Sequence, residues 1–169
     1  MGRFALPEER PPGLDSRWTT RLIKLGSRAQ VKAFRLTNGR IGSHWRIGAG
    51  FRRPVPTLLL EHRGRKSGTL FTTPLLYLGD GERLVVVGSQ GGLPQHPQWF
   101  RNLQATPRTR VHLKGRRDLE VVAHVADADE RARLWPKLVD LYADFEKYAR
   151  WTDREIPVVV LTPVTGTGS

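Results

Sequence analysis

"HRGRKSGTLFTTPLLYLGDGERLVVVGSQGG", residues 62–92, contains two apolar runs separated by Asp80-Gly81. An Asp-Gly pair between two apolar runs is a strong signal for a tight hairpin turn. A third apolar run, 57–62, precedes the glycine-bounded turn 64–68. This stretch therefore predicts three consecutive antiparallel strands. The expected strands are 57–62, 69–78 and 83–89.

Further short strands and helices are expected after this stretch. Pro97 suits the first turn of a short helix, and Pro136 is expected to bend a long C-terminal helix that starts near Asp127 or Asp129. Short strands joined mainly by hairpins predict a mainly β fold, with an antiparallel barrel or curled sheet and flanking helices. The expected elements are strands 111–114, 119–125 and 157–161, and helices 97–105 and 127–151.

The N-terminal part is expected to differ from this barrel. Residues 1–14 form a Pro-rich arm, a helix runs from Asp15 or Ser16 to about Thr37, and residues 38–56 form a linker. Apolar residues and cations both recur along the helix at steps of three and four, which predicts an amphipathic helix with a basic stripe. Such a helix either packs on the domain or lies on an anionic membrane surface. Its cations are Arg17, Arg21, Lys24, Arg28, Lys32 and Arg35.

Length and composition restrict the function. The 169 residues suffice for one well-buried core, here assigned to 51–169, after an N-terminal arm, helix and linker over 1–50. A formal net charge of +12 attracts anions of every kind. The absence of cysteine excludes disulfides, thiolate metal sites and cysteine nucleophiles, and the five histidines show no ligand spacing, so no metal is expected. With no signal peptide or membrane span, a cytoplasmic or peripheral location is expected.

The turn 64–68 is unusually rich in hydrogen-bond donors. Its Arg65, Lys66 and Ser67 suit a phosphate or a carboxylate, although a solvated basic hairpin explains the same residues. The Gly-rich segment 89–92 and the aromatic-rich segment 97–102 add amides, a hydroxyl and two aromatic rings. Together these segments suit a flat, anionic, ring-bearing ligand. The alternative for Trp99 and Phe100 is core packing.

Tyr142, Phe145 and Tyr148 recur at a spacing of three on the expected C-terminal helix. Such spacing places the three rings on one helix face. This face either packs on the barrel or forms an aromatic wall for a hydrophobic substrate, with a phenol as proton donor.

Five motifs in this order resemble the F420H2-dependent quinone reductases of actinobacteria, also known as the deazaflavin-dependent nitroreductase family. The resemblance covers about 51–163 and implies a split β-barrel like that of FMN-binding proteins. It implies an oxidoreductase that transfers a hydride from reduced coenzyme F420 to a quinone, enone or nitro-type acceptor. The motifs are GRKSG (64–68), TPL (73–75), SQGG (89–92), HPQWFRNL (96–103) and WTDREIP (151–157).

The resemblance also implies roles for particular residues. The turn would hold the phosphate of F420 or its acidic tail, Ser89 and Tyr142 would be catalytic, and the aromatic wall would face the substrate. Phe71 and Gln90 stand where the family often has a cation. The implied cofactor-binding residues are Arg65, Lys66, Ser67, Thr72, Thr73, Pro74, Leu75, Leu76, Val87, Gly88, Ser89, Gln90, Gln98, Trp99, Phe100 and Asn102, and the implied substrate wall is Tyr142, Phe145 and Tyr148.

Two other functions stay open at this point. One is an FMN- or haem-binding protein with the same split barrel. The other is a basic nucleic-acid-binding barrel without enzymatic activity, in which Trp99 and Phe100 would stack on bases. The favoured function takes a small quinone-like acceptor as partner, no nucleic acid, and an anionic membrane surface contacted through the N-terminal helix.

Overall fold

The computed structural model describes residues 9, 12, 16–45 and 54–165. The expected arm, apart from Glu9 and Pro12, and most of the expected linker lie outside the described residues. The expected domain boundary between residues 50 and 51 lies there too.

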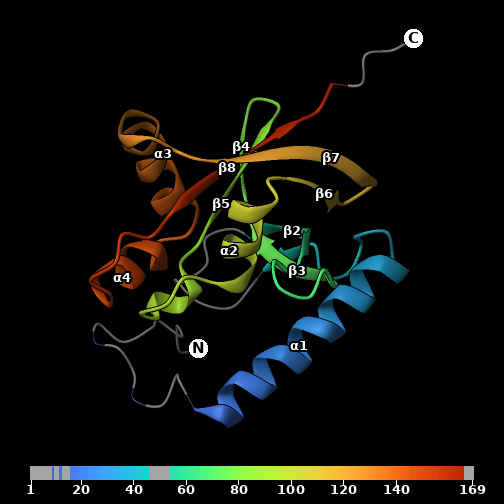
Figure 1. The fold of residues 1–169 in the computed structure, drawn as a ribbon, viewed down its shortest axis with the longest axis horizontal. Coiled ribbons are helices and arrows are strands. Elements are labelled where there is room, and N and C mark those ends of the chain that lie inside the picture. The colour runs from blue at the N-terminus through green and yellow to red at the C-terminus, as the bar shows by residue number, and fades with distance from the viewer. Residues whose placement is uncertain (1–8, 10–11, 13–15, 46–53, 166–169) are drawn as a thin grey trace.

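The strands form one antiparallel sheet that curls into a barrel, as predicted (Figure 1). The strand order is β1-β2-β6-β7-β8-β5-β4. The strand β3 is outside this order and also pairs with β2. Only Tyr77 separates β3 from β4. At this residue the chain stops pairing with β2 and begins to pair with β5. The strands are β1 (His44–Trp45), β2 (Val55–Arg63), β3 (Leu70–Leu76), β4 (Leu78–Asp80), β5 (Arg83–Val87), β6 (Arg108–Leu113), β7 (Arg116–Val125) and β8 (Val158–Pro163).

Two hydrophobic cores lie on opposite faces of the sheet. Successive side chains of a strand point to opposite faces. In β5, Leu84 and Val86 pack in one core and Val85 and Val87 in the other. The short helix α2 (Gln98–Ala105) contributes to the first core, and α3 (Ala128–Leu141) and α4 (Asp144–Arg150) contribute to the second. Burial on both faces explains why these strands are almost continuously apolar.

The expected long C-terminal helix is wrong, because the structure contains two helices, α3 and α4. The helix α3 does begin after Asp127, whose carboxylate accepts a hydrogen bond from the Glu130 amide at 2.8 Å. Pro136 lies inside α3, and the helix ends instead at Leu141, since the next residue, Tyr142, is extended at φ −147° and ψ 94°. This break gives α4 a direction of its own and lets Tyr142 and Phe145 pack in the same core.

The N-terminal helix α1 (Arg17–Leu36) packs on the barrel with only part of its length. Its Phe34 is 2% exposed, and the Arg35 guanidinium binds Glu61 at 3.4 Å and Thr72 at 2.9 Å. Nearer its start, Leu22, Ile23 and Leu25 are each more than 60% exposed. Figure 1 shows α1 on the side of the barrel opposite to α3 and α4. Packing on the domain is therefore confirmed for the C-terminal half of α1 only.

Several element boundaries differ from those expected. The strand β1 lies within the expected linker, where its two residues pair with Val55 and Pro56. Nothing in this Gly- and Pro-rich sequence predicts a strand. The strands β6 and β7 begin at Arg108 and Arg116, each earlier than expected. The added residues are polar and mostly exposed, so no apolar run in the sequence marks them.

Asp80 joins the β4–β5 hairpin to α3, and its loss is expected to destabilise the protein. Its carboxylate accepts hydrogen bonds from Arg133 at 2.8 and 2.9 Å and from Arg83 at 2.6 Å. These bonds, chiefly those of Arg133, hold the pKa of Asp80 well below its usual value. A lowered pKa stabilises the fold above the unfolded-state pKa, and this contribution disappears as the pH falls.

We therefore expect Asp80→Asn to lower the free energy of unfolding by about 1 kcal/mol at pH 7, since Arg133 is partly exposed. Urea unfolding at pH 7 and at pH 3 measures the effect, and the difference from wild type should shrink at pH 3. Asp140→Asn, which changes an exposed aspartate of α3, is the control. Equal midpoints for the two variants at pH 7 would contradict the prediction.

Candidate active site

The turn 64–68 satisfies most of its own backbone amides. Gly68 adopts φ 70°, its amide donates to the Gly64 carbonyl at 2.8 Å, and the Gly64 amide donates to the Thr69 carbonyl at 2.8 Å. The Arg65 amide donates to Asn102 Oδ1 at 3.2 Å. Among the described residues, nothing accepts from the amides of Lys66 and Ser67. An anion at this turn would therefore meet two free amides and two basic side chains.

The start of α2 holds Arg65 in place. Its Nη1 donates to Gln98 Oε1 at 2.8 Å and to Asn102 Oδ1 at 3.3 Å. Asn102 is 3% exposed, and its Nδ2 donates to His62 Nδ1 at 2.9 Å. His62 Nε2 then donates to Thr73 Oγ1 at 2.9 Å. Burial lowers the pKa of His62 to about 4, so the ring is neutral at pH 7 and the network joins β2, β3, the turn and α2.

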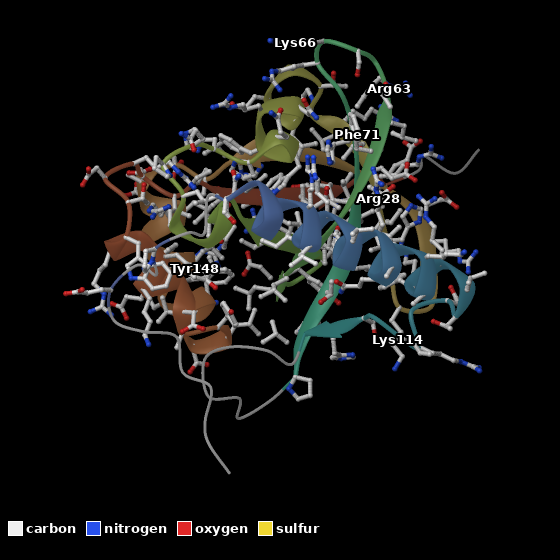
Figure 2. The ribbon with its side chains drawn as sticks, turned by 90° about the horizontal axis from the view of Figure 1, so that it is seen from below. Arg28, Arg63, Lys66, Phe71, Lys114 and Tyr148 are labelled. Atoms are coloured by element: carbon white, nitrogen blue, oxygen red, sulfur yellow. The ribbon has the colours of Figure 1, made fainter. Side chains whose placement is uncertain are left out.

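Arg65 and Lys66 themselves are exposed, which leaves their charges accessible to a ligand. Figure 2 shows Lys66 at the tip of the turn, with Arg63 and Phe71 on the two strands that lead to it. Phe71 is 46% exposed and stacks on His62 with ring centroids 5.6 Å apart.

The implied cofactor-binding run in β3 is divided between the two faces of the strand. Thr73 faces the network of His62, whereas Thr72 binds Arg35 of α1. Because side chains alternate along a strand, one ligand on one face cannot contact the whole run. The first face carries Thr73 and Leu75, and the second carries Thr72, Pro74 and Leu76.

The loop 88–92, which follows β5, packs against the segments around α4. A Cβ at Gly88 would lie 2.7 Å from the Pro157 ring, and one at Gly92 would lie 2.9 Å from the Tyr148 carbonyl oxygen. Both positions therefore require glycine. Ser89 is 8% exposed at the head of this loop, while Val87 before it belongs to the core.

The two aromatic rings of α2 belong to the hydrophobic core. Trp99 is 5% exposed and Phe100 is 4% exposed, with their rings edge to face at 6.1 Å. Both residues therefore pack in the core, which was the alternative prediction for them. Neither ring offers a face on which a nucleic-acid base could stack.

The three aromatic residues after α3 lie together, also largely buried. Tyr142 and Phe145 are each 5% exposed, with ring centroids 5.0 Å apart, and the Tyr142 and Tyr148 hydroxyl oxygens are 3.4 Å apart. Burial and the neighbouring Tyr148 raise the pKa of Tyr142, so its phenol keeps its proton over the physiological pH range. Figure 2 shows Tyr148 on a part of the surface remote from Lys66.

Comparison with known proteins identifies the family. The model of the family described as "F420H(2)-dependent quinone reductase" matches residues 26–163. The chain belongs to this family. The match begins within α1, whereas the motifs found in the sequence cover only about 51–163.

Named relatives and a solved structure agree with this assignment. A Mycobacterium tuberculosis H37Rv protein named "Putative F420H(2)-dependent quinone reductase" is 55% identical over 119 residues, which are 70% of this chain and 98% of the relative. Another from the same strain, named "F420H(2)-dependent quinone reductase", is 37% identical over 150 residues, 87% of this chain and 97% of the relative. The solved structure of an F420-H2 dependent reductase (FDR-A) has 31% identity and a TM-score of 0.57, covering 63% of this chain and 93% of that one. The expected family and the expected split-barrel fold are confirmed.

The chemistry of the turn fits the anionic part of the cofactor that gives the reductase family its name. Phosphate and carboxylate oxygens accept hydrogen bonds, and Arg65, Lys66 and Ser67 present donors. Among the described residues, none of the three forms a hydrogen bond with an acidic side chain. The same turn holds no carboxylate that would repel a phosphate.

Two residues of this candidate site make contacts that the sequence pattern did not predict. His62 supports Asn102 and Thr73 from the buried face of β2. Arg154 donates hydrogen bonds to the carbonyl oxygens of Gly88, Ser89 and Leu93. The only sequence signal for Arg154 is its place in the family motif 151–157, since its partners lie more than 60 residues away.

Proposed function

We propose that this reductase transfers a hydride from F420H2 to a quinone-like acceptor, with enones and nitro compounds as further acceptors of the same type. Membership of the family supports the cofactor. The observation that carries the site is the hydrogen-bonded network from Arg65 through Asn102 to His62 and Thr73. This network joins the basic turn to α2. The loop that contains Ser89 comes shortly before α2 in the chain.

In this proposal the turn binds the anionic end of the cofactor. Arg65, held by Gln98, presents its guanidinium to the phosphate, and Lys66 adds a mobile charge at the tip of the turn. The amides of Lys66 and Ser67 supply two further donors. Thr73 and Leu75 lie on the face of the sheet that also carries His62 of β2, and are better placed for this ligand than Thr72, Pro74 and Leu76.

Reduced F420, when bound, supplies the hydride from C5 of its deazaflavin ring. The protein orients the acceptor and excludes water from the reaction. Ser89 and Tyr142 are assigned to hydrogen-bond the oxygen on which negative charge develops, and the proton that completes the reduction comes from one of them or from solvent. Because the pKa of Tyr142 is raised, its phenol is protonated at neutral pH and can donate a hydrogen bond to that oxygen.

Titration of the purified protein with F420, FMN and haem tests the proposal. We expect saturable binding of F420, followed by oxidation of F420H2 when a quinone is added. Binding of FMN or haem, with no response to F420, would support the other split-barrel function instead. Binding of single-stranded DNA alone would contradict both, and the burial of Trp99 and Phe100 makes that outcome unexpected.

The N-terminal half of α1 supports a second part of the proposal, an attachment to anionic membranes. The exposed side chains Leu22, Ile23 and Leu25 lie on the same part of the helix as Arg21 and Lys24. Each cation close to an anionic bilayer contributes about 1 kcal/mol to binding, and salt weakens this contribution. None of the described helices is long and apolar enough to cross a membrane. A surface location would bring the protein to lipid-soluble quinones.

We expect the double variant Leu22→Ser and Leu25→Ser to bind vesicles rich in phosphatidylglycerol more weakly than wild type, by roughly 10-fold, because two exposed apolar side chains no longer enter the bilayer. Vesicle co-sedimentation in low and high salt measures this difference. Val122→Ser, an exposed apolar residue of β7, is the matched control. Equal binding by wild type and the double variant would refute the attachment.

A further inference from the structure

Arg154 joins the segment after α4 to the loop that follows β5. Its Nε donates to the Leu93 carbonyl at 2.9 Å. Its Nη2 donates to the carbonyls of Gly88 at 3.1 Å and Ser89 at 2.9 Å. One guanidinium thus binds three carbonyl groups of a single loop. Arginine is suited to this contact, because its planar group carries five donors in a fixed arrangement.

The backbone of this loop adopts left-handed conformations at three successive residues. Gln90, Gly91 and Gly92 all have positive φ angles, of 45°, 62° and 73°. A left-handed conformation is unfavourable for a residue with a side chain, such as Gln90. The ladder between β5 and β8 ends at Val87, so the carbonyls after that residue have left the sheet. Three of these carbonyls, those of Gly88, Ser89 and Leu93, accept hydrogen bonds from Arg154.

The same guanidinium also contacts a histidine of this loop region. Arg154 Nη1 lies 3.2 Å from His96 Nδ1, and the His96 ring lies 5.0 Å from the ring of Phe100. Because arginine can only donate, Nδ1 of His96 is the acceptor and the ring proton of the neutral imidazole lies on Nε2. Burial, followed by the charges of Arg154 and Arg101, lowers the pKa of His96 and keeps this neutral form.

Arg154 has no acidic partner among the described residues. Its partners are three carbonyl oxygens and a neutral ring nitrogen. The positive charge of Arg154 therefore stays beside this loop. A partly buried arginine is often paired with a carboxylate instead. Here the guanidinium binds only the loop 88–93 and His96, so it acts on the conformation and the local charge of that loop.

We propose that Arg154 is a positioning residue, which holds the loop 88–93 so that Ser89 faces the bound deazaflavin and its acceptor. This inference rests on the proposed function of the site. If Arg154 acts in this way, loss of its guanidinium displaces Ser89 without removing any group that touches the cofactor. Misplacement by about 1 Å can cost an enzyme about 100-fold in rate.

The kinetic test compares Arg154→Met with wild type, with rates normalised to the amount of F420 bound. We expect kcat to fall by roughly 10- to 100-fold and the Kd of F420 to rise by less than about fivefold. Arg154→Lys should recover part of the loss, since an ammonium group can bind one or two of the carbonyls. Arg116→Met, an exposed arginine of β7, is the control and should retain wild-type rates. A normalised kcat equal to wild type in Arg154→Met would overturn the proposal.

A second measurement needs no cofactor. Hydrogen–deuterium exchange of the cofactor-free protein should become faster in Arg154→Met within residues 88–96 and remain unchanged in the β2–β3 hairpin. Unchanged exchange in the loop, or faster exchange along the whole chain, would overturn the positioning role. If wild type bound no F420, the proposed function would fail, while local exchange would still report whether Arg154 holds the loop.

Discussion

Replacing both Arg65 and Lys66 by alanine is expected to raise the Kd of F420 by at least about 100-fold. A hydrogen bond to a charged group contributes about 1.5–3 kcal/mol, so each single change should weaken binding by roughly 10- to 150-fold. The effect should be large in this chain because Phe71 and Gln90 supply no charge to the site. Fluorescence titration at low and high salt measures the loss, and high salt should bring wild type closer to the variants.

The two residues are expected to differ in kind. Arg65 is held by Gln98 and Asn102, so Arg65→Lys should lose much of the affinity even though the charge remains. Lys66 has no partner among the described residues, so Lys66→Arg should be tolerated. Lys114→Ala removes an exposed lysine from another hairpin turn, away from Lys66 in Figure 2, and is the matched control. Unchanged affinity in the double alanine variant would show that this turn is only a solvated basic hairpin.

The second large effect is expected on turnover. Ser89→Ala and Tyr142→Phe should each lower kcat by roughly 10- to 1000-fold, because a donor that stabilises only the transition state affects rate and not binding. The Kd of F420 should stay close to that of wild type. Stopped-flow oxidation of bound F420H2 by an excess of quinone measures the chemical step directly.

Two controls separate catalysis from packing. Tyr77→Phe removes a half-buried phenol outside the proposed site and should keep the wild-type rate. Tyr148→Phe removes the hydroxyl that lies 3.4 Å from that of Tyr142, and so tests whether their contact matters. Wild-type rates in both Ser89→Ala and Tyr142→Phe would mean that the proton comes from solvent.

Most strands and helix starts could be predicted from local sequence. The Asp80-Gly81 pair fixes one hairpin, and Asp127 fixes the start of α3. The interruption at Tyr77 could not be predicted from the run 69–78 itself. The amide of Tyr77 continues the register of β3 by donating to the Pro56 carbonyl at 3.1 Å, but Pro56 lies in another strand and has no amide hydrogen to donate in return. The end of α3 at Leu141 depends likewise on packing, because Pro136 is the stronger local signal for a break.

The sequence predicts which segments form the candidate site, but it does not predict how their side chains are arranged. The motifs around the turn, the loop and α2 all lie in one connected region of the fold. Which side chains remain accessible could not be predicted: Trp99 and Phe100 are core residues, and the run from Thr72 to Leu76 serves two faces. Burial depends on what covers a face, and a strand's own sequence does not contain that information.

By itself the sequence determined the family, the antiparallel strands and the basic turn, because each depends on residues that lie close together in the chain. Only the tertiary structure decided that α1 packs with half of its length, that Asn102 holds Arg65, and that Arg154 supports the loop of Ser89. These contacts join residues tens of positions apart, and the hydrogen bonds form only after the barrel has brought the segments together. Long-range contacts of this kind leave no periodic pattern in the sequence, which is why the positioning residues emerge from the fold.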